Sequence, residues 1–284
     1  MHFDEKGQIG ACKLKSFLLE KSRVVVQGEG EDFIEHLFTA STHDYLMFFT
    51  NTGRVYVRRV HEIPDMGRSA KGRNIANLLE LQSGEKIAAL IRVESQQDAN
   101  KNDLTWKQER FLFFATESGT VKKTALNAYA NVRRTGINAI GINEGDRLIT
   151  VKLTTGHDEV VLITSDGKSI RFNEENVRSM GRTAAGVRGI RLGKEDRLVA
   201  AAIVAKEATL LVAGENGIGK RTEFDEYRVQ SRGGKGIITM KTTAKTGGVC
   251  GALAVRDTDE IMLITVGGQM VRTGVEHIRM TGRN

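Results

Sequence analysis

Apolar and polar positions along this chain follow a pattern that repeats five times. Each copy is an apolar run, a tight turn that ends in glycine, a second strand-like run, a basic loop and then more strand-like sequence. The copies begin at His43, Glu109, His157, Ala208 and Thr258. Their turn glycines are Gly53, Gly119, Gly167, Gly217 and Gly268. Glycine supplies the positive φ that a tight hairpin turn needs, and the flanking β-branched and aromatic residues favour strands. The pattern therefore predicts a series of β-hairpins.

The spacing of the turn glycines predicts the architecture. Successive glycines lie 66, 48, 50 and 51 residues apart, and each copy has room for about four strands. Repeats of about 50 residues with four strands are typical of propeller blades. The longer first interval contains a polar segment, residues 95–109, which we expect to be a surface loop.

The two ends of the chain do not hold a full copy. Residues 31–41 match the closing strand of a unit, so an earlier unit precedes His43; its turn glycine would be Gly7, and no basic loop is recognisable after it. The sequence stops inside the basic loop of the last copy. We expect one all-β domain over residues 1–284, a six-bladed, propeller-like disc whose first and last blades are incomplete. The expected units span about residues 1–42, 43–108, 109–156, 157–206, 207–257 and 258–284.

The composition is that of a folded soluble protein, because 40% of the residues are hydrophobic and 27% are charged. The two cysteines, Cys12 and Cys250, form no CxxC pair, and the longest apolar run, residues 198–205, is too short to span a bilayer. We therefore expect a cytoplasmic protein with no membrane partner. The net charge of +7 points to a polyanionic partner.

The positive charge is concentrated in the basic loops. Residues 66–73, 131–136, 178–191, 228–241 and 279–283 hold 15 of the 42 Lys and Arg and none of the 35 Asp and Glu. The rest of the chain, with 27 basic and 35 acidic residues, has a net charge of −8. Fifteen residues after each turn glycine the chain has Arg68, Arg134, Arg182, Arg232 and Arg283. A second basic position, four residues after the glycine, lies within the strand, where we expect solvated charges. It holds Lys123, Arg171, Arg221 and Arg272, and Val57 in the first copy.

Five equivalent arginine loops on a propeller would form a basic track around its rim. Such a track suits duplex DNA bent around the disc, because each loop can neutralise a phosphate and release counterions. Glycines beside the arginines let main-chain N–H groups approach phosphates, and no aromatic residue interleaves to stack on single-stranded bases. Two alternatives are that the repeated residues only build a repeated turn, or that the rim binds an acidic protein. The expected DNA-binding residues are Arg68, Lys71, Arg73, Arg133, Arg134, Arg178, Arg182, Arg188, Gln230, Ser231, Arg232, Gly233, Gly234, Lys235, Gly236 and Arg283.

No catalytic residue, metal site or cofactor is expected. The six His residues are scattered, without the spacing of metal ligands. The segment GENGIGK, residues 214–220, lies across a hairpin and lacks the Ser or Thr and the helix that a phosphate-binding loop requires. Tyr129 and Tyr227 shortly precede loop arginines, and we expect them to pack beneath the loops.

Several motifs together resemble the C-terminal domain of the A subunit of DNA gyrase. The segment YRVQSRGGKG, residues 227–236, resembles the family's box Gln-Arg-Arg-Gly-Gly-Lys/Arg-Gly, with Ser231 at its second position. The family's box normally lies in the first blade, whereas here it lies in the fifth unit. The phrases EDFIEHLFTASTHD, GTVKKT, VRSMG, GVRGIRLG, GKRT and MVRT occur in the family's order across residues 31–284.

The resemblance implies a six-bladed β-pinwheel, with strands exchanged between blades, that binds and wraps duplex DNA around its rim. It implies a role in ATP-dependent supercoiling with the B subunit of gyrase and the remainder of its A subunit, in the bacterial cytoplasm beside the nucleoid. The family's catalytic tyrosine lies in a winged-helix domain, and no tyrosine of this chain has that context, so we do not expect an enzyme in its own right. The related domain of topoisomerase IV and a protein-interaction propeller remain as alternatives.

Overall fold

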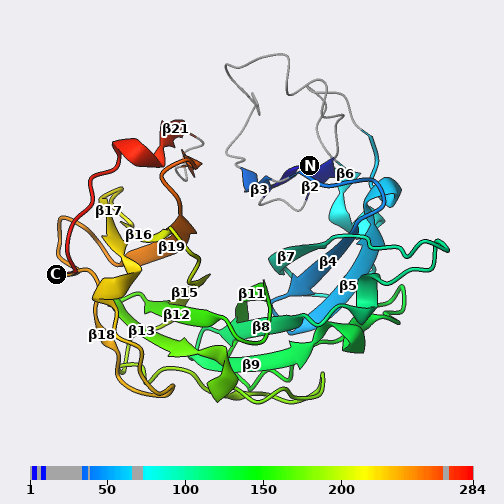
Figure 1. The fold of residues 1–284 in the computed structure, drawn as a ribbon, viewed down its shortest axis with the longest axis horizontal. Helices are drawn as coiled ribbons and strands as arrows, with labels where there is room; N and C mark the ends of the chain where they lie inside the picture. Colours follow the sequence, from blue (N-terminus) through cyan, green and yellow to red (C-terminus); the bar gives the residue numbers. More distant parts are fainter. Residues whose placement is uncertain are drawn as a thin grey trace.

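The computed structural model describes residues 2–4, 8–10, 34–37, 39–65, 73–264 and 269–283. Its regular structure is all strand apart from short 3-10 helices, and the strands form six sheets that follow one another along an arc in chain order (Figure 1). The expected all-β, propeller-like fold is confirmed. Within the described ranges, no helix is long and apolar enough to cross a membrane.

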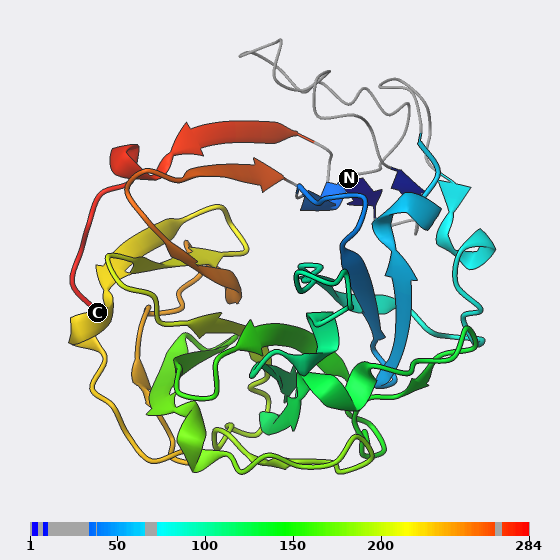
Figure 2. The same ribbon diagram turned by 45° about the vertical axis from the view of Figure 1, so that its right-hand side comes forward.

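Each complete unit contributes three main strands to its own sheet. In the unit that begins at His43, β4 (Tyr45–Thr50) and β5 (Arg54–Arg59) form a hairpin, and β7 (Ile87–Val93) pairs with the other side of β4. The corresponding strands of the next three units are β8 (Phe111–Thr116), β9 (Thr120–Ala125) and β11 (Leu148–Thr154); β12 (Glu159–Thr164), β13 (Lys168–Asn173) and β15 (Leu198–Ile203); and β16 (Thr209–Gly214), β17 (Gly219–Glu223) and β19 (Val249–Val255). The third strands, β7, β11, β15 and β19, contact one another in succession along the inside of the arc (Figure 2).

The fourth strand of a sheet comes from the following unit. The short strands β6 (Arg73–Asn74), β10 (Ile137–Asn138), β14 (Val187–Arg188) and β18 (Ile237–Ile238) pair with β2, β5, β9 and β13 of the preceding sheets. This is the strand exchange that the resemblance implies. In these four sheets, the outer edge of the blade and the loop that leads to it are therefore built by residues of two consecutive units.

The two ends of the arc differ from its middle. The first unit, whose repeat is hard to recognise in the sequence, still supplies β1 (His2–Asp4), β2 (Gln8–Gly10) and β3 (Ile34–Leu37), and β6 completes a four-stranded sheet. The fifth sheet has three strands, and the sixth has two, β20 (Glu260–Ile264) and β21 (Met270–Gly274). Main-chain pairing with neighbours builds the first sheet even where the side-chain pattern is weak.

In the five units that follow the first, a short 3-10 helix that was not expected from the sequence follows the second strand. These helices are η1 (Val60–Glu62), η4 (Leu126–Tyr129), η5 (Glu174–Asn176), η6 (Phe224–Glu226) and η7 (Val275–His277). Two more, η2 (Ile75–Asn77) and η3 (Thr105–Lys107), lie in connections. Four of them, η1, η4, η5 and η6, lead the chain out of its own sheet and toward the exchanged strand on the preceding one.

The hydrophobic core lies between neighbouring sheets. Phe49 of β4 meets Phe114 of β8 edge to face, with ring centroids 5.5 Å apart, and Phe113 on the other face of β8 meets Phe172 of β13 at 6.3 Å. The first strands are buried along almost their whole length because they have a sheet on both sides. This is why they are continuous apolar runs and show no alternation.

The basic residues four positions after the turn glycines are not solvated where the next unit covers them, contrary to the expectation from sequence. Lys123 and Arg221 are 6% and 5% exposed. Lys123 Nζ donates to the carbonyl oxygen of Glu174 at 3.0 Å, and Arg171 Nη1 donates to that of Phe224 at 2.6 Å. Both acceptors begin a 3-10 helix of the following unit. The second strand is therefore buried beneath that unit, and its cations clamp consecutive units together.

Candidate nucleic-acid interface

The basic loops at residues 131–136, 178–191 and 228–241 lie on the outer side of the blades, where the chain passes from its own sheet to the preceding one (Figure 1). Gly186 and Gly236 directly precede the exchanged strands, with φ of +107° and +72°. A Cβ on Gly236 would lie 2.5 Å from the carbonyl oxygen of Ser169. Only glycine allows the loop to lie this close to the neighbouring strand. The glycines therefore fix where the arginines stand on the rim.

Arg68 and Lys71, two of the expected DNA-binding residues, lie outside the described residues, as do the expected turn glycines Gly7 and Gly268. Arg73, from the same loop as Arg68, is exposed at the start of β6. It lines a surface pocket of about 400 Å³ together with Arg58 and Arg134. The pocket thus joins arginines of two consecutive loops.

Arg133 and Arg134 are both exposed. Arg134 Nε lies 3.8 Å from Glu80 Oε1, a solvent-screened pair that leaves the guanidinium accessible. The buried Arg58 donates from Nη2 to the carbonyl oxygen of Arg134 at 3.1 Å and so holds the main chain below it. This loop is two residues shorter than the next two, because Arg134 stands two positions before Gly136, whereas Arg182 and Arg232 stand four before their glycines. The count from the turn glycine therefore does not place Arg134 at an equivalent point of its loop.

The loop of the unit 157–206 carries three arginines whose guanidinium groups have no partner among the described residues. Arg178 and Arg188 are exposed, and Arg182 is half-buried. Within the described part of the chain, none of these three guanidinium groups forms a hydrogen bond or an ion pair. Lys122, fully buried in β9, donates from Nζ to the carbonyl oxygens of Ala139 at 2.7 Å and Arg182 at 2.6 Å. Burial, with a smaller contribution from the charge of Arg182, lowers the pKa of Lys122 to about 8.

The arginine of the box-like segment has a different role from Arg182. Arg232 Nε donates to the carbonyl oxygen of Asn176 at 2.9 Å, and its Nη1 donates to that of Arg188 at 3.0 Å. Both acceptors belong to the preceding unit. Arg232 is thus largely engaged in joining two loops, so here the interpretation as a turn-building arginine is partly right.

The other box residues form the connection to the preceding blade. Ser231 and Lys235 are exposed, and the main-chain N–H of Gln230 donates to the carbonyl oxygen of Arg171 at 2.8 Å. Gly233 N donates to Gly189 O at 2.6 Å, and Gly234 O accepts from Arg191 N at 2.8 Å. These two glycine main-chain groups therefore bond to the neighbouring loop of the protein.

Arg283 resembles Arg232 more than Arg182. Its Nη1 donates to the carbonyl oxygen of Ile238 at 3.4 Å, and its main-chain N–H lies 3.5 Å from Glu226 Oε2. The carbonyl oxygen of the preceding Gly282 accepts a 2.9 Å bond from Lys220 Nζ. The last described loop is thus also held to the blade before it.

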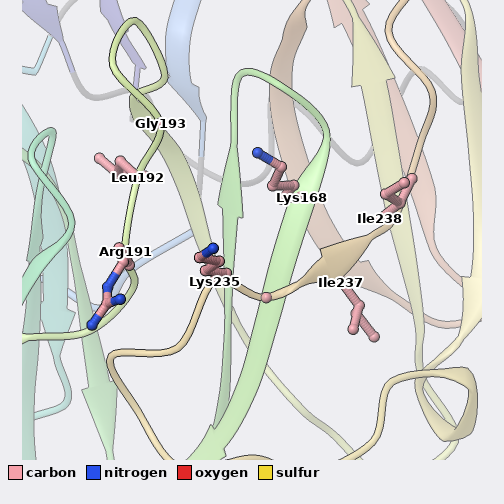
Figure 3. A pocket seen from close by; sticks show the side chains of 8 residues that line it. Lys168, Arg191, Leu192, Gly193, Lys235, Ile237 and Ile238 are labelled. Carbon is pink, nitrogen blue, oxygen red and sulfur yellow. The ribbon is translucent and has the colours of Figure 1, made fainter.

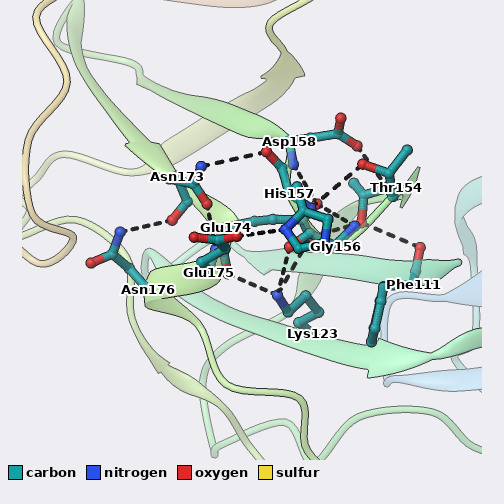
Figure 4. Close-up of polar contacts among 11 residues, drawn as sticks. Phe111, Lys123, Thr154, Gly156, His157, Asp158, Asn173, Glu174, Glu175 and Asn176 are labelled. Atoms are coloured by element: carbon teal, nitrogen blue, oxygen red, sulfur yellow. Dashed lines mark hydrogen bonds and ion pairs between the residues drawn. The ribbon is translucent and has the colours of Figure 1, made fainter. Parts of the chain in front are cut away.

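A buried polar network supports the loop that carries Arg178 and Arg182. Figure 4 shows Lys123 of β9 beside Glu174, which begins η5; Lys123 Nζ lies 3.9 Å from Glu174 Oε2. The fully buried carboxylate of Glu174 also accepts from Gly156 N at 2.8 Å and Asp158 N at 2.9 Å. The equivalent first helical residues of the other units are the buried apolar Val60, Leu126, Phe224 and Val275. Glu174 is a charge at an otherwise apolar position, and Lys123 compensates it.

Tyr129 and Tyr227 are buried beneath the loops, as expected. Sequence reasoning missed Lys122, which supports the main chain of Arg182, and two accessible cations close to the box, Lys168 and Arg191. Arg191 lies in the basic loop at residues 178–191, which has no acidic residue, but it was not among the expected DNA-binding residues. Lys168 directly follows the turn glycine Gly167, a position with no common residue type in the other copies.

Comparison with known proteins identifies the family to which these repeats belong. The sequence model of the family described as "DNA gyrase C-terminal domain, beta-propeller" matches residues 44–94, 110–155, 158–205, 208–255 and 259–284. The A subunit of DNA gyrase from Salmonella typhimurium is 44% identical over 264 residues, which are 93% of this chain and 29% of that protein. The Escherichia coli protein is 43% identical with the same coverage. The chain thus spans less than a third of the length of these relatives.

Solved structures agree on the fold. The crystal structure of the C-terminal domain of DNA topoisomerase IV superimposes with a TM-score of 0.81 at 26% identity, covering 99% of this chain and 85% of that one. The structure of a DNA gyrase A C-terminal domain gives a TM-score of 0.78 at 24% identity, covering 99% and 91%. The repeats, the exchanged strands and the family match lead to one conclusion: the chain belongs to the DNA gyrase C-terminal domain family of β-propellers.

Proposed function

We propose that the chain is a non-catalytic domain that binds and wraps duplex DNA within the A subunit of a type IIA topoisomerase of the gyrase kind. The observation that carries the proposal is the set of accessible cations without competing acidic partners on the outer side of consecutive blades, with Arg182 as its clearest member. Guanidinium groups in such positions suit backbone phosphates, which carry no base identity. Binding is therefore expected to be independent of sequence.

The curvature of the arc supports wrapping in preference to simple attachment. The loops stand on the outer side of sheets that follow one another around the disc, so a duplex that contacts successive loops has to bend with them (Figure 1). Contacts with successive phosphates offset the cost of bending, which is about 1–6 kcal/mol for a 20–30 bp site. The number of loops engaged then sets how far the duplex is bent.

Strand cleavage and ATP-dependent supercoiling belong, in this proposal, to the B subunit of gyrase and to the rest of its A subunit, in the bacterial cytoplasm at the nucleoid. The chain supplies the DNA-wrapping part of that assembly and needs no cofactor for it. A topoisomerase IV-type DNA-binding domain is the second candidate. It is favoured by the box-like segment standing in the fifth unit with Ser231 in place of arginine.

The test is the salt dependence of binding to a labelled duplex. We expect binding at low salt, and a log K that falls by about 0.9 per neutralised phosphate for each tenfold rise in salt. Replacing Arg133, Arg134 and Arg182 by Gln should flatten this slope, whereas replacing the exposed Lys101 and Lys206 should not. Undetectable duplex binding at low salt would refute the proposal and leave the acidic protein partner as the remaining role of the rim.

A further inference from the structure

A second basic pocket lies beside the box-like segment, at the junction of the units 157–206 and 207–257. It has a volume of about 380 Å³ and is lined by Lys168 of β13, by Arg191 and its neighbours after β14, and by Lys235 with the start of β18 (Figure 3). No acidic residue lines it. Among the described residues, the side chains of these three cations form no hydrogen bond and no ion pair. Their charges are therefore available to a ligand.

The pocket is built by the main chain of two units. Arg191 N donates to Gly234 O at 2.8 Å, and Gly233 N donates to Gly189 O at 2.6 Å, so the two loops are joined at the two glycines that follow the box arginine. Arg232 adds its bond to the carbonyl oxygen of Arg188. These contacts hold Arg191 and Lys235 at the same pocket, although the two belong to different repeats.

The equivalent place one junction earlier has the same main-chain contact between loops, but it lacks the three cations. There Thr120 follows the turn glycine, Ala185 precedes the loop glycine, and Gly141 takes the place of Arg191; Gly141 N bonds to Ala184 O at 3.1 Å. One junction before that, Arg54 stands in the place of Lys168. Its guanidinium is engaged, since it donates to Thr135 O at 2.7 Å and lies 3.6 Å from Glu85. Of these three junctions, only the one beside the box has three unengaged cations around one pocket.

We propose that Lys168, Arg191 and Lys235 form a composite phosphate clamp that anchors one stretch of the DNA backbone at this junction. The inference rests on the proposed function and refines it, because the junctions along the rim then differ in how strongly they bind DNA. Arg232 positions the two loops. The DNA phosphates are bound by the neighbouring cations of the clamp, which do not recur at the same position in the other repeats. A cavity with several ammonium and guanidinium donors and no acid fits neighbouring backbone phosphates, each of which offers several acceptor oxygens.

The experiment compares duplex binding by the unaltered protein with that of Lys168→Gln, Arg191→Gln, Lys235→Gln and the triple variant. Each single change should reduce the salt slope by about 0.9, and the triple variant should lose affinity on the order of 100-fold at moderate salt. The matched control is Lys101→Gln with Lys206→Gln, which removes exposed lysines outside the basic loops. Because the three clamp residues are surface residues without partners, the melting temperature should not change.

A second pair of variants adds charge to the junction that lacks the three cations. Thr120→Lys with Ala185→Lys should tighten duplex binding and steepen the salt slope, since it places two cations around the preceding junction. The clamp is disproved if the triple variant binds duplex with the affinity and slope of the unaltered protein. That result leaves the proposed function standing, whereas failure of the unaltered protein to bind duplex removes both proposals.

Discussion

The ammonium group of Lys122, buried in one blade, donates a 2.6 Å hydrogen bond to the carbonyl oxygen of Arg182 in the loop of the next unit. The guanidinium of Arg182 has no partner within the described residues, so the main chain of this residue is fixed while its charge stays available. The rim thus separates two tasks. Buried cations hold the loops, and accessible cations face the solvent from which a polyanion would approach.

The buried ammonium of Lys122 should be visible in the pH dependence of stability. Its pKa of about 8 in the folded protein lies below the ordinary value of 10.5. Between these two values the unfolded chain binds a proton that the folded chain has lost, so the free energy of unfolding should rise with pH, by up to about 1.4 kcal/mol per pH unit.

Urea unfolding at pH 7 and pH 9.5 measures this effect, with Lys122→Met as the reference that cannot titrate. The difference in unfolding free energy between the unaltered protein and Lys122→Met should grow in favour of the unaltered protein as the pH rises. The tyrosines that begin to ionise in the unfolded chain at pH 9.5 are the same in both proteins, so their effect cancels in this difference. A difference that stays constant or shrinks would contradict the low pKa of Lys122.

Arg182 and Arg232 should respond differently to lysine. Lysine keeps the charge but cannot reproduce the two fixed donors with which Arg232 reaches the carbonyl oxygens of Asn176 and Arg188. Arg232→Lys should therefore lose nearly as much duplex affinity as Arg232→Ala, about 1–2 kcal/mol. Arg182→Lys should keep most of the affinity that Arg182→Ala loses. If Arg232→Lys bound DNA like the unaltered protein, its charge rather than its geometry would be what matters.

Gly236 and Gly217 provide a matched pair for the fit of the loop. Both have positive φ, +72° and +77°, but a Cβ on Gly236 meets Ser169 O at 2.5 Å, whereas a Cβ on Gly217 has open space around it. Gly236→Ala should cost more than about 2 kcal/mol of unfolding free energy and weaken duplex binding, and Gly217→Ala should cost about 1 kcal/mol and leave binding unchanged. Equal losses in thermal unfolding would show that the close approach of the loop does not matter.

Lys123 and Glu174 should behave as a coupled pair. Lys123→Met leaves the buried carboxylate of Glu174 without its cation, at a cost of about 3–5 kcal/mol. In the double variant with Glu174→Gln the charge is gone, while an amide oxygen still accepts from the N–H groups of Gly156 or Asp158, so part of the loss should be recovered. Denaturant unfolding of both single variants and the double variant gives the coupling energy. Strictly additive losses would mean that the two residues act independently.

The fold could be predicted from the sequence because its determinants are local. A turn glycine such as Gly167 adopts the positive φ of a tight turn, and an apolar run such as β12 indicates a strand that is covered on both faces. Both signals recur about every 50 residues and predict five blades in order, and the match of residues 31–41 to a closing strand predicts one more blade before them. The 3-10 helices were missed because they are short and begin with residues as different as Glu174 and Phe224.

The candidate site was only partly predictable because its partners are distant in sequence. Arg171 was interpreted as solvated, yet it is half-buried, and its guanidinium donates to the carbonyl oxygen of Phe224 in the following unit, 53 residues away. Arg232 and Arg182 have the same place in the repeat, and they are distinguished by the contacts of Arg232 with Asn176 and Arg188, which lie 56 and 44 residues away. Lys168 has no repeated pattern at all. Whether a cation is free or engaged depends on the neighbouring blade, which no local pattern records.

The central claim is that duplex DNA follows the curved rim. The most direct measurement seals a nicked circular plasmid with DNA ligase in the presence of this protein and then separates the topoisomers after the protein is removed. We predict that the mean linking number shifts in proportion to the protein bound, and that the shift shrinks when Arg133, Arg134 and Arg182 are replaced by Gln. A topoisomer distribution that stays unchanged at saturating protein, under conditions where duplex binding is measured, would contradict wrapping.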